Sequence, residues 1–195
     1  MKKVLGSVLL LTSVYAMAGE NYYQNAWDAK GLLALEGAFG SAQTKLTEPN
    51  PSGGDHIISN TSNSAFGGGL KLGGESEHYR LFVSGRYHAV DNYDYVMTAG
   101  MELQYLLRFT EYFDVFMGVN GGMMGSQATI GSTEYSVWNP YAGGDLGINI
   151  DVLENFGIEL GVRVNKAFSD STEIGSVDLL AEGYASLVFK FTSDY

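Results

Sequence analysis

The stretch from Val177 to Phe191 constrains the fold more than any other part of the chain. Its odd positions are all apolar or small, whereas its even positions are mixed and include Asp178, Glu182 and Lys190. Successive side chains of a β-strand point to opposite faces, so this pattern predicts one long strand with an apolar face and a wetter face. What covers the apolar face then decides the fold.

The N-terminus has the three parts of a secretory signal peptide. Lys2 and Lys3 give a positive start, residues 4–15 are mostly apolar, and Ala16-Met17-Ala18 is a small-x-small cleavage pattern. The apolar stretch is shorter than the roughly 20 residues that a membrane-spanning helix needs. We therefore expect residues 1–18 to be a cleaved signal peptide and residues 19–195 to form one exported domain.

Composition excludes several classes of function. The chain has no cysteine, which excludes disulfides, zinc–thiolate sites, a cysteine nucleophile and a lipoprotein anchor. Its net charge of −11 argues against a nucleic-acid partner, because phosphate neutralisation needs clustered lysine and arginine. No later segment has the apolar run of a membrane helix. If the chain spans a membrane, it must do so as a closed sheet, which satisfies every backbone polar group.

Eight stretches of the chain fit the two-faced strand pattern. Most are close to the 9–11 residues, roughly, of a tilted transmembrane strand. Connections after the second, fourth and sixth are short, whereas the polar segments 41–63 and 121–136 are expected to be long loops. Short periplasmic turns and long extracellular loops are typical of outer-membrane barrels. The expected strands are residues 33–39, 66–72, 79–88, 95–105, 113–120, 138–150, 156–165 and 177–191.

Two features favour a membrane barrel over a soluble barrel or sandwich, which would also alternate. The less apolar face is rich in Gly, Ala and Ser, which suits the crowded inside of a narrow barrel. Aromatic residues of the apolar face lie at both strand ends, as in the two girdles of a membrane barrel. The predicted fold class is therefore all-β, an eight-stranded antiparallel up-and-down transmembrane β-barrel. The girdle residues are Phe39, Phe66, Tyr87, Tyr95, Trp138 and Phe168 at one end, and Tyr79, Tyr105, Phe113, Phe156, Phe189 and Phe191 at the other.

The segment Trp138–Gly147 resembles a motif of a known family. Its Pro140-Tyr141-x-Gly143-x-x-x-Gly147 spacing is similar to a strand of the small barrels of the outer membrane protein A and outer membrane protein X kind. The segment Asn155–Arg163 resembles the family's next strand. The resemblance covers the mature chain. It implies a monomer in the outer membrane, inserted by the barrel-assembly machinery and in contact with lipid and lipopolysaccharide.

Charged residues on the inward face form the candidate site. A tight hairpin at residues 151–155 would place Asp145 diagonally from Arg163, and the simplest register would place Arg163 opposite Glu182. We expect these two acids to hold Arg163. A dry lumen tolerates charges only when they are paired, so the simplest role is structural. The family resemblance implies an alternative, a latch that swaps partners and opens a narrow porin-like channel. The other expected lumen charges are Glu36, Lys71, Arg80, Arg86, Glu102 and Glu159.

Other chemistry has little support in the sequence. Some related barrels modify lipid A with a His, a Ser and an acid, but His88 and Ser84 are roughly 13 Å apart along one strand. His88 and His78 are expected at the barrel rims and His56 in a loop. No EF-hand or His-x-x-x-His spacing occurs, so we expect no enzyme activity, metal or cofactor. The loops 41–63 and 121–136 remain the candidate surface for a host or surface ligand, beside a role in membrane integrity.

Overall fold

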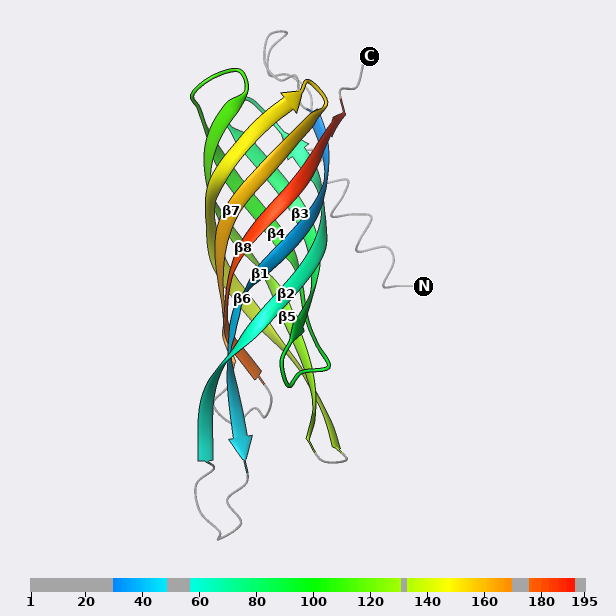
Figure 1. The fold of residues 1–195 in the computed structure, drawn as a ribbon, viewed down its shortest axis with the longest axis vertical. Coiled ribbons are helices and arrows are strands. Elements are labelled where there is room, and N and C mark those ends of the chain that lie inside the picture. Colours follow the sequence, from blue (N-terminus) through cyan, green and yellow to red (C-terminus); the bar gives the residue numbers. More distant parts are fainter. Residues whose placement is uncertain (1–29, 49–56, 131–132, 170–175, 192–195) are drawn as a thin grey trace, which may run out of the picture.

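The chain folds into a single closed sheet. The computed structural model describes residues 30–48, 57–130, 133–169 and 176–191. Eight antiparallel strands pair in chain order around a closed barrel, which confirms the predicted up-and-down topology (Figure 1). None of the described residues forms a helix long and apolar enough to cross a membrane. The expected signal peptide lies outside the described residues. The strands are β1 (Lys30–Glu48), β2 (Ile57–Glu75), β3 (Tyr79–Val90), β4 (Tyr95–Arg108), β5 (Phe113–Ile130), β6 (Thr133–Leu153), β7 (Phe156–Ala167) and β8 (Ser176–Phe191).

The two ends of the barrel differ in their connections. We call the end with the short links after β2, β4 and β6 the turn end; β1 begins there and β8 ends there, with Gly31 opposite Phe191. We call the other the hairpin end. In Figure 1 the turn end is at the top, and the β1–β2 and β5–β6 hairpins project at the bottom beyond the rest of the wall.

The segments 41–63 and 121–136, expected as loops, are mostly strand. β1 pairs with β2 as far as Glu48 and Ile57, and β5 pairs with β6 as far as Ile130 and Thr133. The two-residue alternation of burial continues into the first of these segments, where Ala42 and Thr44 are buried and Gln43 between them is exposed. Asn63, for example, is buried and its Nδ2 donates to Thr44 Oγ1 at 3.0 Å. Polarity suggested loops, but period-2 burial determines the structure. Residues 49–56 and 131–132 lie outside the described residues.

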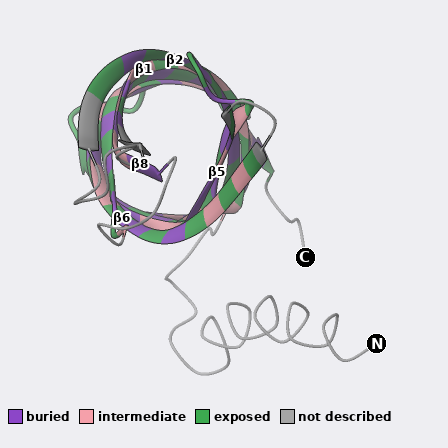
Figure 2. Cartoon of the chain, turned by 90° about the horizontal axis from the view of Figure 1, so that it is seen from below, coloured by how far each residue is buried: buried purple, intermediate pink, exposed green. Residues whose placement is uncertain are grey.

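Burial in the barrel is the inverse of that in a soluble protein. Outward apolar side chains such as Leu146 and Val162 are 52% and 59% exposed, whereas Lys71, Arg80 and Arg163 are among the largest fully buried side chains. Figure 2 shows the alternation as stripes of buried and exposed residues around the wall. The predicted inward and outward faces are confirmed along the described strands, with one departure in β8.

The departure is at the start of β8. Val177 was expected to face outward, but it is buried. The β1–β8 register shifts between Gln43, which pairs with Leu179, and Thr44, which pairs with Val177. Asp178 is therefore the extra residue of a β-bulge, which changes the face that Val177 occupies. Val177 consequently points into the lumen, and the predicted order holds from Leu179 onward.

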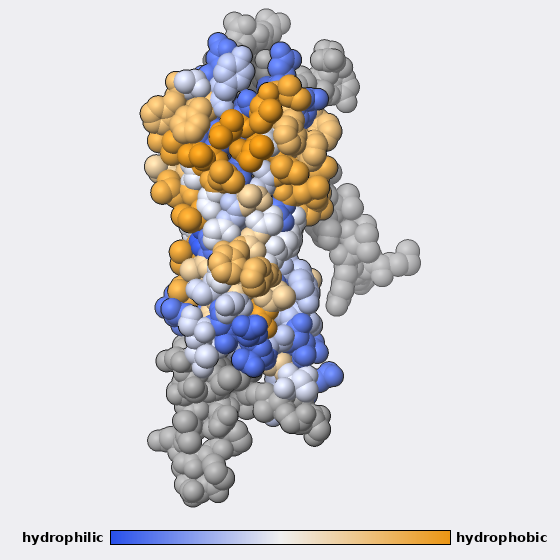
Figure 3. Space-filling view, in the orientation of Figure 1, coloured by the Kyte–Doolittle hydropathy of each residue, from blue (hydrophilic) through white to orange (hydrophobic). Residues whose placement is uncertain are grey.

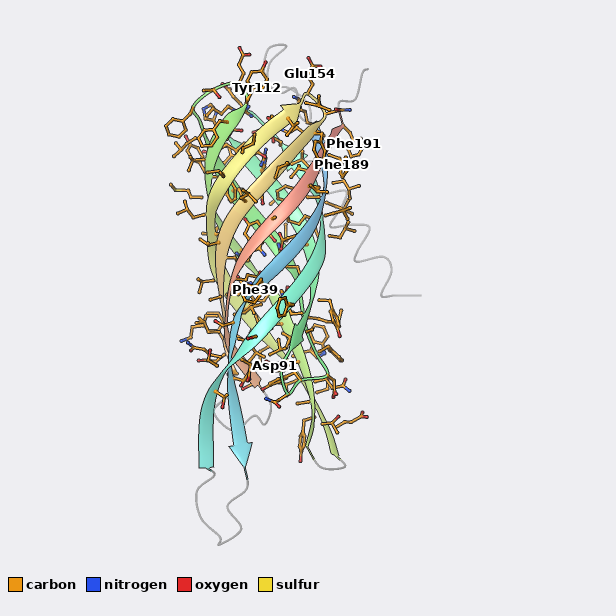
Figure 4. All side chains as sticks on the ribbon, viewed as in Figure 1. Phe39, Asp91, Tyr112, Glu154, Phe189 and Phe191 are labelled. Atoms are coloured by element: carbon orange, nitrogen blue, oxygen red, sulfur yellow. The ribbon has the colours of Figure 1, made fainter. Side chains whose placement is uncertain are left out.

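Outward aromatic residues gather near both ends of the wall. Figure 4 places Phe39 toward the hairpin end, and Phe189 and Phe191 near the turn end. The rings of Phe39 and Phe66 lie 4.8 Å apart, in contact across the β1–β2 pair. On the face drawn in Figure 3, two apolar zones are separated by a paler zone. Two aromatic zones on an apolar exterior are the arrangement of a wall that meets a lipid layer.

Candidate functional site

Glycines on the inner wall make room for the large side chains that fill the lumen. A Cβ added at Gly161 would lie 2.7 Å from Cζ of Tyr184, and one at Gly69 would lie 2.6 Å from Cγ of Arg86. Each long side chain therefore lies across a glycine of the neighbouring strand. An eight-stranded barrel has room inside for side chains and little else, so these glycines allow the charged residues to pack.

The central cluster comprises the buried charges in the middle of the lumen, and Glu36 contacts three of its cations. Arg86 Nε donates to Glu36 Oε1 at 2.6 Å, and Lys71 Nζ lies 3.3 Å from Oε2. Arg163 donates to both carboxylate oxygens, at 2.8 and 3.0 Å. A two-pronged arginine–carboxylate contact is among the stronger charged hydrogen-bond geometries. The cluster consists of Glu36, Lys71, Arg86, Glu102, Asp145, Glu159, Arg163 and Glu182.

Arg163 also binds a second carboxylate. It lies opposite Glu182 in the β7–β8 register, and its Nη1 donates to Glu182 Oε1 at 2.8 Å. Its Nη2 lies 3.7 Å from Glu102 Oε2, and its guanidinium carbon lies 4.2 Å from the centre of the Tyr184 ring. Glu102 is in turn hydrogen-bonded to Arg86. The charges therefore form one connected network.

Asp145 does not hold Arg163, contrary to the prediction. The two residues are directly opposite in the β6–β7 register instead of diagonal. Asp145 Oδ2 accepts from Gln104 Nε2 at 2.9 Å and from the Tyr184 hydroxyl at 3.4 Å. Among the described residues, no hydrogen bond or ion pair joins Asp145 to Arg163. The guanidinium reaches past β8 to Glu36 of β1, whose two oxygens match its planar donors.

Lys71 and Arg80 continue the network toward the turn end. Lys71 Nζ lies 2.6 Å from Glu159 Oε1, and it also lies over the rings of Phe82 and Tyr184, at 5.1 and 5.2 Å. Arg80 Nη1 lies 3.5 Å from Glu159 Oε2. Glu159 thus connects the central cluster to a second group of charges, and aromatic rings fill the space between them.

That second group, the turn-end cluster, consists of Glu75, Arg80, Arg108, Asp151 and Lys190. Arg80 Nε donates to Glu75 Oε2 at 2.6 Å, and Arg108 Nη2 donates to Oε1 at 3.2 Å. Lys190 Nζ lies 2.7 Å from Asp151 and 3.4 Å from Glu75. Of these residues only Arg80 was predicted as part of the site. Glu75 follows Gly73-Gly74, which suggested a turn, but β2 continues through both glycines.

The hairpin end of the lumen is closed by apolar side chains, which we call the mouth cluster. Tyr93, from the β3–β4 link, is tucked into it, and its hydroxyl donates to the backbone oxygen of Ser176 at 3.4 Å. The preceding residue, Asn92, has a positive φ of 67°, a conformation that asparagine tolerates better than most residues. No pattern in the sequence indicated that Tyr93 would be buried. The cluster is Ala42, Ala65, Val90, Tyr93, Val96, Met124, Ala128, Tyr141, Ala167, Val177 and Leu180.

Known structures share the closed antiparallel barrel of this chain. The fold is that of small outer-membrane barrels. The chain is similar to Neisserial surface protein A, with 15% identity and a TM-score of 0.62 over 86% of this chain and 100% of that one. It is similar to outer membrane protein H (OprH) of P. aeruginosa, with 17% identity and a TM-score of 0.55 over 83% and 99% of the two chains. It is also similar to the N-terminal β-barrel domain of Pseudomonas aeruginosa OprF, with 10% identity and a TM-score of 0.53 over 83% of this chain and 99% of that one.

These likenesses establish the fold and nothing finer. No protein-family model matches the chain, and no curated protein matches its sequence. The structural matches include several kinds of small outer-membrane barrel. The specific resemblance to the outer membrane protein A and outer membrane protein X kind therefore stays a prediction.

The barrel places His78 at a rim as predicted, but it places His88 differently from the prediction. His88, expected at a rim, is buried inside the lumen at 1% exposure, whereas His78 is exposed at the turn end. Ser84 Oγ accepts from Arg86 Nη1 at 2.9 Å, and among the described residues no hydrogen bond joins Ser84 to His88. No three His, Cys, Asp or Glu side chains in the described ranges are grouped to hold a metal ion. The chemistry that the lumen offers is ion pairing.

Proposed function

We propose that the protein is an integral outer-membrane barrel that supports membrane integrity and makes surface contacts through its projecting hairpins. The observation that carries this proposal is the inverted burial. Outward apolar side chains such as Leu146 and Val162 are about half exposed, whereas inward charges such as Arg163 are buried. An apolar exterior of this extent is stable only against lipid or a partner. A signal peptide at residues 1–18 and insertion by the barrel-assembly machinery belong to the same proposal.

Charge substitution on the outer wall tests the membrane location. Arginine at an outward position near the middle of a bilayer destabilises a barrel by about 2–4 kcal/mol. We expect this loss for Leu146→Arg, measured by urea unfolding in lipid vesicles. Ser136→Arg is the matched control, because Ser136 is exposed on the same strand in the projecting hairpin. Equal stability of Leu146→Arg and wild type would contradict lipid contact at this face.

Unpaired strand edges support the surface-contact part of the proposal. β2 pairs with β3 only from Ala65 onward, and β6 pairs with β7 only from Tyr141 onward. Within the described chain, residues 57–64 and 133–138 therefore have a strand partner on one side only. Such edges offer backbone N–H and C=O groups to an extended segment of another protein. In this proposal the hairpins lie on the cell surface, where they would contact a host molecule or the surrounding lipopolysaccharide.

Shortening both projections tests this role. We would compare cells that carry the wild-type barrel, a barrel with both hairpins shortened to the level of β3–β4, and no barrel. Adherence to an epithelial monolayer reports surface contact, and detergent resistance reports membrane integrity. The proposal expects the shortened barrel to lose adherence and keep detergent resistance. Adherence equal to that of the wild type would contradict a contact role for the hairpins.

A narrow channel gated by the lumen charges is the second candidate, and one observation favours it. Arg163 lies among Glu36, Glu102 and Glu182, so a shift toward one carboxylate weakens its contact with another. The apolar mouth cluster argues against an open path. Single-channel conductance of the refolded barrel in a planar bilayer tests this candidate. Openings that change in Arg163→Ala would support a channel, whereas a silent bilayer with folded protein would leave a plugged barrel.

A further inference from the structure

His88 lies between the mouth cluster and the central cluster, without a satisfied hydrogen bond. Its side chain is about 1% exposed, and in the described structure neither Nδ1 nor Nε2 has a hydrogen-bond partner. A buried polar group left in this state destabilises a protein by about 1–3 kcal/mol. Stability alone therefore does not explain an imidazole at this position, and its contacts point to another role.

The group next to the imidazole is a shared carboxylate. His88 Nδ1 lies 3.4 Å from Glu182 Oε2, while Glu182 Oε1 accepts from Arg163 Nη1 at 2.8 Å. One carboxylate therefore lies between two cationic groups of different kinds. The guanidinium is charged at every physiological pH. An ordinary histidine side chain changes its charge between about pH 5 and 8.

The imidazole has no room to move away from Glu182 toward β2. A Cβ added at Gly67 would lie 2.4 Å from His88 Nδ1, so the ring already rests on the β2 backbone. On the β4 side it faces Val96, which carries no charge. A change in the charge of the ring must therefore be answered by the charged groups around it. These are Glu36 of β1, Arg86 of its own strand, Arg163 of β7 and Glu182 of β8.

The charges around His88 oppose one another. Glu36 and Glu182 carry negative charge, whereas Arg86 and Arg163 carry positive charge. Glu102 of β4 contacts Arg86 and Arg163, and among the described residues no hydrogen bond or ion pair joins it to His88. Glu182 is the carboxylate that touches His88 in the described structure. It is therefore the group that responds first when the ring gains a proton.

We propose that His88 and Glu182 form a proton-operated latch on Arg163. With His88 neutral, Glu182 holds Arg163 together with Glu36. When His88 takes a proton from the medium, its Nδ1–H donates to Glu182 Oε2 and draws the carboxylate away from Arg163, which Glu36 continues to hold. Acidification is thereby transmitted from the mouth cluster to the central cluster. The latch requires only the closed barrel, and it stands apart from any ligand of the hairpins.

The latch predicts that two distant side chains report one titration. The refolded barrel, labelled with ¹⁵N and ¹³C at histidine and arginine, is titrated in detergent micelles between about pH 5 and 8. We expect the His88 ring carbons and the Arg163 Nε–H to shift with the same midpoint. Arg80 Nε–H is the internal control, because Arg80 is bonded to Glu75 in the turn-end cluster.

His88→Gln decides between the latch and a general effect of pH. This substitution removes the titration and keeps a polar side chain of similar length, so the Arg163 signal should become independent of pH. An Arg163 shift that persists in His88→Gln would overturn the proposal. So would a wild-type Arg163 signal that does not move, or a His88 ring that does not titrate in this range. If Glu182→Gln folds, it should leave His88 titrating and Arg163 unresponsive.

Discussion

The central cluster and the turn-end cluster are built from the same residue types but differ in their access to water. Glu36 and Arg163, in the central cluster, have side chains that are 1% and 0% exposed. In the turn-end cluster Glu75, Arg80 and Lys190 are still buried, but the side chains of Arg108 and Asp151 at its outer edge are 37% and 15% exposed. The two groups are joined through Arg80 and Glu159, so the difference lies in hydration, not in connectivity.

This difference indicates what each cluster contributes. In the dry centre a charge that loses its partner has no water to replace it, so every member depends on the others. At the rim, water solvates a charge that loses its partner, and an exposed pair is worth little. Residue types alone would suggest equal importance. Burial predicts instead that the effect of removing one charge falls steadily from the centre of the barrel to its turn end.

The largest effect is expected at Glu36. Glu36→Ala leaves Lys71, Arg86 and Arg163 without the carboxylate that they share, and removing one partner of a buried ion pair costs about 3–5 kcal/mol. Urea unfolding in lipid vesicles measures the loss. Glu77→Ala is the control, because the Glu77 side chain is 84% exposed in a turn and should leave stability unchanged. A loss as small as that of Glu77→Ala would show that the central cluster rearranges or is hydrated.

An intermediate effect is expected at Lys190, near the turn end. Its Nζ contacts Asp151 and Glu75, but Glu75 keeps Arg80 and Arg108, and Asp151 is partly exposed. Charged hydrogen bonds of this kind contribute about 1.5–3 kcal/mol. Lys190→Met keeps the length of the side chain and removes its charge, so the same unfolding assay isolates the electrostatic part. A loss equal to that of Glu36→Ala would contradict the gradient from centre to rim.

Most of the fold could be predicted from the sequence, because alternation is a direct consequence of strand geometry. The aromatic and aliphatic residues of the outer wall, such as Leu146 and Phe39, marked the central parts of the strands clearly. The ends were harder to predict. Thr44 and Asn63 are buried although they are polar, so the inward positions of the projecting hairpins could not be recognised by polarity. These segments were therefore expected as loops. The bulge at Asp178 could not be predicted from the sequence of β8, because one inserted residue is recognised only when the strand is aligned with its partner.

The sequence predicted which charged residues face the lumen, but it predicted only some of the contacts between them. Inward parity identified Glu36, Arg163 and Glu182 as lumen residues. Cross-strand register also gave the contact between Arg163 and Glu182, which lie on adjacent strands. The bond from Arg163 to Glu36 joins two strands that are not adjacent, β7 and β1. The reach of a long side chain past a strand depends on the curvature of the barrel and on nearby glycines. His88 was misplaced for a related reason, because its depth depends on where the neighbouring strands end.

The smallest effect is expected at Arg108, where the comparison can be sharpened with salt. Arg108 Nη2 lies 3.2 Å from Glu75, but its side chain is 37% exposed, and exposed pairs contribute about 0–1 kcal/mol. Arg108→Ala should therefore lose little stability relative to the wild type at low salt. At about 1 M salt, where the Debye length is only about 3 Å, this difference from the wild type should vanish. Glu36→Ala should be insensitive to the same change, because ions do not enter the dry centre. Equal salt dependence of the two variants would mean that water and ions reach both clusters, and the lumen would then be a conduit instead of a plug.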